Sequence, residues 1–122
     1  MDMHYRLDVL GFYHTGDPDV TSNFAIWDLV EALHWVQREI GSFGGDPGRV
    51  TMMGHSSGAG AVDLLSLVPT TEGLFSQILP MSGLAAAGDL GGETVAKASR
   101  DLAIKMGCSS EREWAQDGTR HK

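Results

Sequence analysis

The sequence predicts an α/β fold, with a short parallel sheet and flanking helices. Residues 50–53 form a short apolar, β-favouring run that is typical of a buried parallel strand. Residues 23–40 repeat apolar side chains every three or four positions, as a helix with one buried face does. Residues 5–12, ahead of that helix, are also β-favouring and apolar. A strand, a helix and a second strand form a βαβ unit, in which a right-handed crossover makes the strands parallel.

The first segment, residues 5–12, is interrupted by Gly11, so we interpret it as a strand end that runs into a loop rich in turn residues. The helix begins next, with Ser22 or Asn23 available to cap its N-terminus. Gly41 suits the exit from its C-terminus. The apolar face consists of Ile26, Leu29, Val30, Leu33, Val36 and Ile40, widened by Trp27 and Trp35. The sequence therefore predicts a helix that packs on the core.

A turn-rich connector, residues 42–48, leads from this helix to the strand at 50–53. Within it Asp46 can accept hydrogen bonds from backbone N–H groups that follow, and Pro47 fixes the first position of a turn. The connector therefore delivers the chain into the strand in a defined geometry.

The strand is followed at once by Gly54-His55-Ser56-Ser57-Gly58, a G-x-S-x-G pentapeptide. Small residues and then an apolar run come after it and predict a helix. Strand, sharp turn and helix form the setting of a nucleophile elbow. The serine at the tip of such a turn has a strained backbone that holds its hydroxyl clear of neighbouring atoms.

Spacing selects Ser56 over Ser57 as the candidate nucleophile. Strand and helix backbones pass closely in such a turn, so we expect glycine two residues before and after the serine. Ser56 has Gly54 and Gly58 at these positions, whereas both corresponding neighbours of Ser57 carry side chains. The N–H of Ser57 would open the helix and point at a developing oxyanion. A G-x-S-x-G pattern also arises by chance in a chain with 16 glycines, so the flanking strand and helix give it weight.

Two further elements follow. Residues 76–82 contain a short apolar run that predicts a third strand, although Pro80 weakens this interpretation. Residues 93–106 predict a final helix that stops at Gly107. Residues 109–122 have no periodicity, and we expect a disordered tail there. The apolar side of the final helix would consist of Val95, Ala96, Ala98, Leu102, Ala103 and Met106.

Length and charge exclude several classes of function. A chain of 122 residues has room for one small domain. Its net charge of −7 argues against nucleic acid or an anionic membrane surface as a partner. No apolar run reaches the length of a membrane span, and residues 1–10 lack the basic and hydrophobic regions of a signal peptide. Cys108 is the only cysteine, so an internal disulfide is excluded.

Several stretches together resemble the type-B carboxylesterase family. They are YRLDVLGF, TGDP, the run from Ser22 to Val62, LFSQILPMSG and LAIKMGC. The family includes cholinesterases, insect and nematode carboxylesterases, and the non-catalytic neuroligins. The likeness runs from about residue 5 to residue 108, and the pairing of FGGDP-x-x-VT with G-x-S-x-G is specific to this family.

The resemblance implies a partial α/β-hydrolase fold over residues 1–122 and hydrolysis of a small-molecule carboxylic ester through an acyl-enzyme, without cofactor or metal. It makes Ser56 the nucleophile and the N–H of Ser57 an oxyanion donor. His55 stands where the family usually has Glu, although His and Gln also occur there. Ala is usual at the position of Ser57, a tolerable change because only the backbone is used. The family's GN-x-G becomes Ser-Asn-Phe-Ala, which leaves Asn23 in place.

Family members are several times longer than this chain. Their glycine-rich oxyanion loop lies upstream of Met1, and their acid and general-base histidine lie far downstream of the elbow. None of the histidines here fits the base, because four precede or adjoin the nucleophile and one lies on the predicted tail. These are His4, His14, His34, His55 and His121. We therefore expect a fragment that is inactive by itself and prone to aggregate, because a short parallel sheet leaves edges and an apolar face uncovered.

In the family a cysteine commonly follows the final helix and is bonded to another a short distance later. Here Cys108 lacks such a partner, and the likeness ends after Ser110, which suggests a truncated gene model, a splice variant or a fragment. By resemblance the protein would be secreted or in the secretory pathway. The alternatives to an esterase are a neuroligin-like adhesion protein and an inactive truncated product. The intact Gly54-x-Ser56-x-Gly58 favours the enzyme; the sequence does not indicate which ester is cleaved or the oligomeric state.

Overall fold

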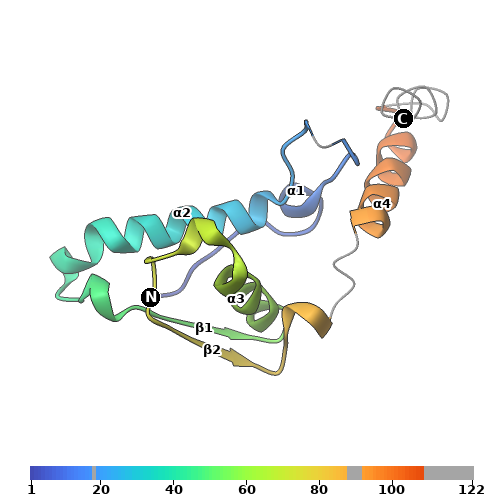
Figure 1. The fold of residues 1–122 in the computed structure, drawn as a ribbon. Coiled ribbons are helices and arrows are strands. Elements are labelled where there is room, and N and C mark those ends of the chain that lie inside the picture. The colour runs from blue at the N-terminus through green and yellow to red at the C-terminus, as the bar shows by residue number, and fades with distance from the viewer. Residues whose placement is uncertain (18, 88–91, 109–122) are drawn as a thin grey trace.

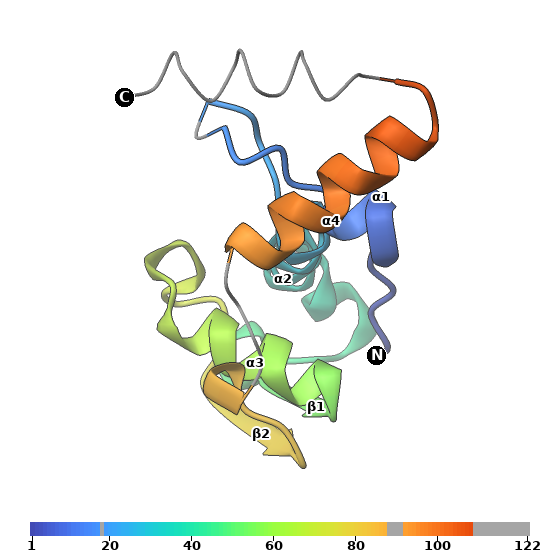
Figure 2. The same cartoon turned by 90° about the vertical axis from the view of Figure 1, so that its right-hand side faces the viewer.

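The computed structural model describes residues 1–17, 19–87 and 92–108. Figure 1 shows a long helix, α2, lying over a small parallel sheet, with α3 beside the sheet and α4 apart from it. The turned view in Figure 2 again places α4 near α1 and away from the strands. The elements are α1 (Asp8–Phe12), α2 (Phe24–Glu39), β1 (Thr51–His55), α3 (Ser57–Leu67), β2 (Gln77–Met81) and α4 (Gly92–Lys105), with short 3₁₀ turns at Ile40–Phe43, Pro47–Arg49, Pro69–Thr71 and Ala85–Ala87.

The sheet contains two parallel strands in the described part of the chain. Thr51 of β1 is aligned with Gln77 of β2, and the register continues without a bulge to the last residue of each strand. The connection between the strands contains α3, so β1, α3 and β2 form a βαβ unit. The strands predicted at residues 50–53 and 76–82 are therefore confirmed, and Pro80 lies inside β2 opposite Gly54.

The strand end predicted at residues 5–12 is wrong, because the chain forms α1 there, and the βαβ unit predicted from that strand, α2 and β1 is wrong with it. Arg6 holds this segment to α2: its Nε and Nη2 donate to the two carboxylate oxygens of Asp28 at 2.8 and 2.6 Å. The same guanidinium lies 5.1 Å from the ring centroid of Phe24. A Cβ on Gly11 would come within 2.3 Å of the Arg6 carbonyl oxygen, so the bend requires glycine. Long-range contacts thus override the local β preference.

The Arg6 hydrogen bonds also lower the pKa of Asp28 to about 2, because they stabilise its ionised form. The pKa of Arg6 is raised in turn by the hydrogen bond to Asp28. The pair therefore remains ionised over the physiological range, and it joins the segment just before α1 to α2 on a solvent-exposed face.

The N-terminal boundary predicted for α2 is confirmed at Asn23, but the side-chain cap there and the exit predicted at Gly41 are wrong. Asn23 is the N-cap residue, but its side chain makes no cap hydrogen bond and its backbone is left-handed, with φ 57°. Asn tolerates this conformation better than most residues do. At the other end the helix continues into the 3₁₀ turn Ile40–Phe43, so the left-handed exit falls at Gly44, with φ 79°, rather than at Gly41.

The core lies between α2, α3 and one face of the sheet. It consists of Leu29, Val30, Leu33, Met52, Val62 and Leu65. These residues confirm the predicted apolar face of α2, but Trp27 and Trp35 are 50% and 37% exposed and do not widen it. The opposite face of the sheet is open, with Met53 65%, Leu79 50% and Met81 38% exposed. A parallel sheet is normally covered on both faces, so this open face is the unusual one.

Side chains fasten the amino ends of the two strands. The amide of Gln37 donates to the carbonyl oxygens of Pro47 at 2.8 Å and Leu74 at 3.0 Å, which lie ahead of β1 and β2 respectively. The hydroxyl of Ser76 donates to the Gly48 carbonyl at 2.7 Å. The Asp46 side chain accepts the Gly48 N–H at 2.8 Å, as predicted for the connector.

The last predicted helix is confirmed as α4, which ends at Lys105, and Gly107 follows it with a left-handed φ of 73°. The N–H of Cys108 donates to the Ala103 carbonyl at 2.9 Å, as in a Schellman motif. On the predicted apolar side Ala103 is buried, but Ala98 and Met106 are exposed. The tail predicted at residues 109–122 lies outside the described residues. No helix in the described part is long and apolar enough to span a membrane.

Candidate active site

Ser56 lies in the turn between β1 and α3, where its backbone has φ 56° and ψ −119°. This conformation is rare for a residue with a side chain, and such strain costs of order 1–3 kcal/mol. Ser56 occupies the N-cap position of α3, yet its side chain makes no cap hydrogen bond. The residue is exposed. The hydroxyl is therefore presented to solvent without serving the helix.

The glycine two residues before Ser56 is required by close packing. A Cβ on Gly54 would lie 2.2 Å from the Gly58 carbonyl oxygen. A Cβ on Gly58 itself would meet nothing within 4 Å among the described residues, so the expected crowding exists at Gly54 and not at Gly58. The Gly58 carbonyl is the atom that crowds Gly54, but this close approach does not require residue 58 itself to be glycine.

A third glycine, Gly83, also packs against the turn and was not singled out from the sequence. A Cβ there would lie 2.2 Å from the Ser56 carbonyl oxygen and 3.2 Å from the Ala59 Cβ. The N–H of Ser56 donates to the Met81 carbonyl at 2.9 Å, which ties the turn to the end of β2. The carboxyl ends of neighbouring parallel strands share one edge of a sheet. A glycine just after β2 is therefore the sequence feature from which this contact with the Ser56 turn could be predicted.

The N–H of Ser57 is free to act as a donor. Ser57 is the first residue of α3, and its N–H has no acceptor among the described residues. The carbonyl of Ser56 already accepts the N–H groups of Ala59 at 3.0 Å and Gly60 at 3.2 Å. The first turn of α3 contains no acidic residue, so the partial positive charge of the helix end is not neutralised there.

The described histidines are not hydrogen-bonded to Ser56. His55 is the last residue of β1, is exposed, and is aligned with Met81. His14 donates its backbone N–H to the Ser99 hydroxyl at 3.0 Å, and its buried Nδ1 has no hydrogen-bond partner in the described chain. No histidine of residues 1–17, 19–87 and 92–108 forms a hydrogen bond with Ser56. His121 lies outside those ranges.

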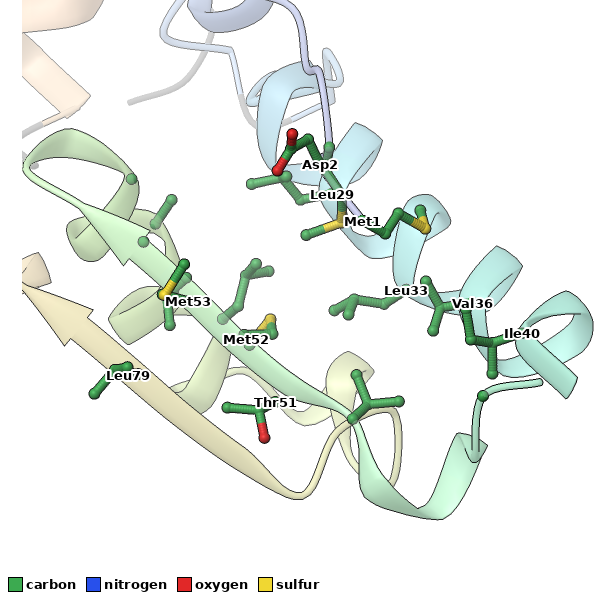
Figure 3. A pocket seen from close by; sticks show the side chains of 18 of the residues that line it. Met1, Asp2, Leu29, Leu33, Val36, Ile40, Thr51, Met52, Met53 and Leu79 are labelled. Atoms are coloured by element: carbon green, nitrogen blue, oxygen red, sulfur yellow. The ribbon is translucent and has the colours of Figure 1, made fainter. Parts of the chain in front are cut away.

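A cavity of about 750 Å³ lies between α2 and β1. Figure 3 shows Leu33 and Val36 of α2, and Ile40 just after it, facing Met52 across the cavity, and Leu79 of β2 also belongs to its lining. Gly54 and Gly58 belong to its lining, but Ser56 does not. The cavity therefore reaches the foot of the turn without containing the serine hydroxyl. Within the described residues there is also no group of three His, Cys, Asp or Glu side chains that could hold a metal ion.

Known proteins resemble this chain in both sequence and fold. Esterase cest-33 of Caenorhabditis elegans is 49% identical over 85 residues, which are 70% of this chain and 15% of that protein. Human neuroligin-2 is 41% identical over 109 residues, 89% of this chain and 13% of its own. Pig liver carboxylesterase is 40% identical over 108 residues, 88% of this chain and 19% of its own. The chain thus spans less than a fifth of the length of these relatives.

Two solved structures have the same architecture. Juvenile hormone esterase from Manduca sexta, solved with OTFP covalently attached, superposes with a TM-score of 0.81 at 34% identity, over 93% of this chain and 22% of that one. A carboxylesterase of Geobacillus stearothermophilus gives 0.78 at 36% identity, over 89% and 24%. The parallel sheet and its helices therefore belong to the α/β-hydrolase fold. The sequence profile of the carboxylesterase family matches residues 1–119, and this chain is a member of that family.

Proposed function

We propose that this chain is the part of a serine carboxylesterase that carries the nucleophile, Ser56, and one oxyanion donor, the N–H of Ser57. The observation that carries the proposal is the backbone of Ser56, strained at φ 56° and ψ −119° with an exposed residue and no cap hydrogen bond. A serine that only capped a helix would not need such strain. The strain, the strand before and the helix after are the features of a nucleophile elbow.

The reaction would proceed in two steps. The Oγ of Ser56 attacks the ester carbonyl, its proton passes through a base to the leaving alcohol, and an acyl-enzyme remains. Water then attacks the acyl-enzyme, releasing the carboxylic acid and restoring the serine. In both steps the N–H of Ser57 donates to the tetrahedral oxyanion, a contribution typically worth about 10²–10³ in kcat for one such donor.

We propose that the base, the acid that orients it and a second oxyanion donor come from residues outside this segment. Without them the Ser56 hydroxyl has the reactivity of an ordinary alcohol. The 122-residue chain alone is then inactive. Its open sheet face, where Met53 is 65% exposed, would also make it prone to aggregate. A fluorophosphonate probe tests the inactivity: stoichiometric labelling of Ser56 in purified monomer would contradict it.

The catalytic proposal is tested by a grafted enzyme, in which residues 1–108 of this chain replace the matching segment of pig liver carboxylesterase. Hydrolysis of p-nitrophenyl acetate is measured. We expect turnover that Ser56→Ala lowers by at least about 10⁴-fold, because removing a nucleophilic serine abolishes the acyl-enzyme route. Ser66→Ala is the matched control, since the Ser66 hydroxyl donates to the Asp63 carbonyl on the exposed side of α3. Equal turnover in the Ser56 and Ser66 variants would refute the proposal.

A non-catalytic adhesion role is the second candidate, because human neuroligin-2 is 41% identical over 109 residues. A grafted enzyme that folds, as judged by its circular dichroism and melting, but does not turn over ester would favour this role or an inactive truncated product. A secretory location, expected from the family resemblance, is tested by whether a longer reading frame directs the protein into the secretory pathway.

A further inference from the structure

The segment that follows β2 lies directly against the turn that carries Ser56. A Cβ on Gly83 would be 2.2 Å from the Ser56 carbonyl oxygen, and one on Gly60 would be 3.7 Å from the Leu84 carbonyl oxygen. The 3₁₀ turn Ala85–Ala87 packs on α3. Residues 82–87 therefore run along the first turns of the helix that begins at the candidate nucleophile.

Among the described residues, hydrogen bonds at Met81 and Ala85 fasten this segment. The Ser56 N–H donates to the Met81 carbonyl at 2.9 Å, just before the segment. Seven residues along α3, the Asp63 carboxylate accepts the Ala85 N–H at 2.8 Å. Ala85 is 7% exposed, so its N–H is shielded from water and depends on that carboxylate. Asp63 is thus a side chain of α3 that holds the start of the 3₁₀ turn Ala85–Ala87 to the elbow helix.

Residues 82–87 in turn restrict the backbone conformation of Ser56. Ser56 has a strained backbone, which persists only while its surroundings hold it. Between the two fastenings Ser82 has a φ of 57°, so the segment is itself strained and needs a fixed end. Releasing Ala85 would let Gly83 move from the Ser56 carbonyl and let the turn relax.

We propose that Asp63 is a positioning residue for the Ser56 hydroxyl. It touches no reacting atom and acts through residues 82–85, which it holds against the turn. The inference rests on the proposed function, because it assigns Asp63 a part in the alignment of Ser56 with the Ser57 N–H. Misplacement of a reacting group by about 1 Å can cost of order 100-fold in rate, so a carboxylate remote from the substrate can matter.

The kinetic test uses the grafted enzyme. Asp63→Ala should lower kcat about tenfold or more and change KM less than about twofold, since the change disturbs alignment and not substrate binding. Asp63→Asn keeps an acceptor oxygen and should retain most of kcat. Asp46→Ala is the matched control, because Asp46 also accepts a backbone N–H at 2.8 Å, but at the amino end of β1. Equal kcat losses for Asp63→Ala and Asp46→Ala would overturn the proposal, and so would a fall in melting temperature with kcat unchanged.

Ala85, which donates its N–H to Asp63, provides a second, independent variant. Ala85→Pro deletes the donor N–H at the first position of a 3₁₀ turn, where a proline ring is tolerated. It should reproduce the kcat loss of Asp63→Ala, and the double variant should be no worse than either single one. Fully additive losses would show that the two residues act separately and would refute the mechanism.

Hydrogen exchange separates this inference from the proposed function. In the 122-residue chain, Asp63→Ala should speed exchange of the Ser56 amide at least about tenfold relative to Asp46→Ala, because the Ser56–Met81 bond loosens. If the grafted enzyme lacks turnover, the proposed function fails while this measurement still decides the positioning role. Unchanged exchange at Ser56 would overturn that role whatever the activity.

Discussion

The two ends of the parallel sheet are built in different ways. At the amino ends of the strands, side chains hold the backbone: the Gln37 amide bridges the carbonyls of Pro47 and Leu74 at 2.8 and 3.0 Å. At the carboxyl ends, backbone packs on backbone, and glycines stand where no Cβ fits. Ser56 and Ser82, with φ of 56° and 57°, lie at the carboxyl ends, whereas no residue with a side chain has positive φ between Asn23 and β1.

The difference separates stability from function. The side-chain hydrogen bonds at the amino end require no backbone strain. They join α2 to the segments just ahead of β1 and β2, so they stabilise the fold. The carboxyl end, where α/β proteins bind their ligands, holds strained residues that the rest of the structure must support. We therefore expect changes at the amino end to lower stability and changes at the carboxyl end to lower activity.

Apart from changes to Ser56 itself, the largest effect on kcat should come from Gly83→Ala. The new Cβ would lie 2.2 Å from the Ser56 carbonyl oxygen, a backbone atom, so the turn must shift. We expect kcat of the grafted enzyme to fall at least about 100-fold. Gly58→Ala is the matched control, because its Cβ meets nothing within 4 Å in the described chain and helix propensity favours Ala by about 1 kcal/mol. Similar kcat values for the two variants would show that close packing of residue 83 on the Ser56 turn does not support turnover.

At the amino end, Gln37→Leu should act on stability alone. It leaves two carbonyls without their side-chain donor, which should lower the free energy of unfolding by about 1–3 kcal/mol. Urea unfolding and kcat of the grafted enzyme are measured together. A kcat loss comparable with that of Gly83→Ala would break the division between the two ends.

Ser56→Gly should stabilise the protein while abolishing turnover. Glycine adopts positive φ without strain, so the free energy of unfolding should rise by about 1 kcal/mol relative to Ser56→Ala, which keeps the strain. Urea unfolding of both variants measures the difference. Equal stability of the two would mean that the turn at Ser56 stores no strain.

The smallest effect concerns Asp28, which lies away from both ends. Its folded-state pKa of about 2 is below the ordinary value of 3.8, so its contribution to stability is present above about pH 4 and is lost as pH falls toward 2. Asp28→Asn should remove this part of the pH dependence and leave kcat unchanged. The urea midpoint from pH 5 to pH 2, compared between the two proteins, checks it; identical slopes would contradict the expectation.

The sequence predicted the parts of this fold whose signals are local. Apolar runs identified β1 and β2, the three- and four-residue periodicity identified α2 and α4, and the glycine spacing identified the turn at Ser56. These patterns need no knowledge of distant residues. The role of Ser56 stays a proposal, since the geometry of its turn is described but its chemistry is not.

Contacts between residues far apart in the chain, and one neighbouring turn, account for what the sequence did not predict. The segment at residues 5–12 becomes α1 because Arg6 binds Asp28, 22 positions away. Gly83 matters because parallel pairing brings it to Ser56. The exit of α2 moved to Gly44 because a 3₁₀ turn extended the helix. In each case a tertiary contact or a neighbouring turn outweighed a local preference.

The open face of the sheet has a chemical consequence for its sulfur atoms. Met53 and Met81 are 65% and 38% exposed on that face, whereas Met52, on the opposite face, is 3% exposed. An oxidant that reaches the surface would convert the first two thioethers to sulfoxides and spare the third. Each sulfoxide adds a polar oxygen to an apolar patch. The extent of methionine oxidation in a sample would therefore change the hydration of this face of the sheet.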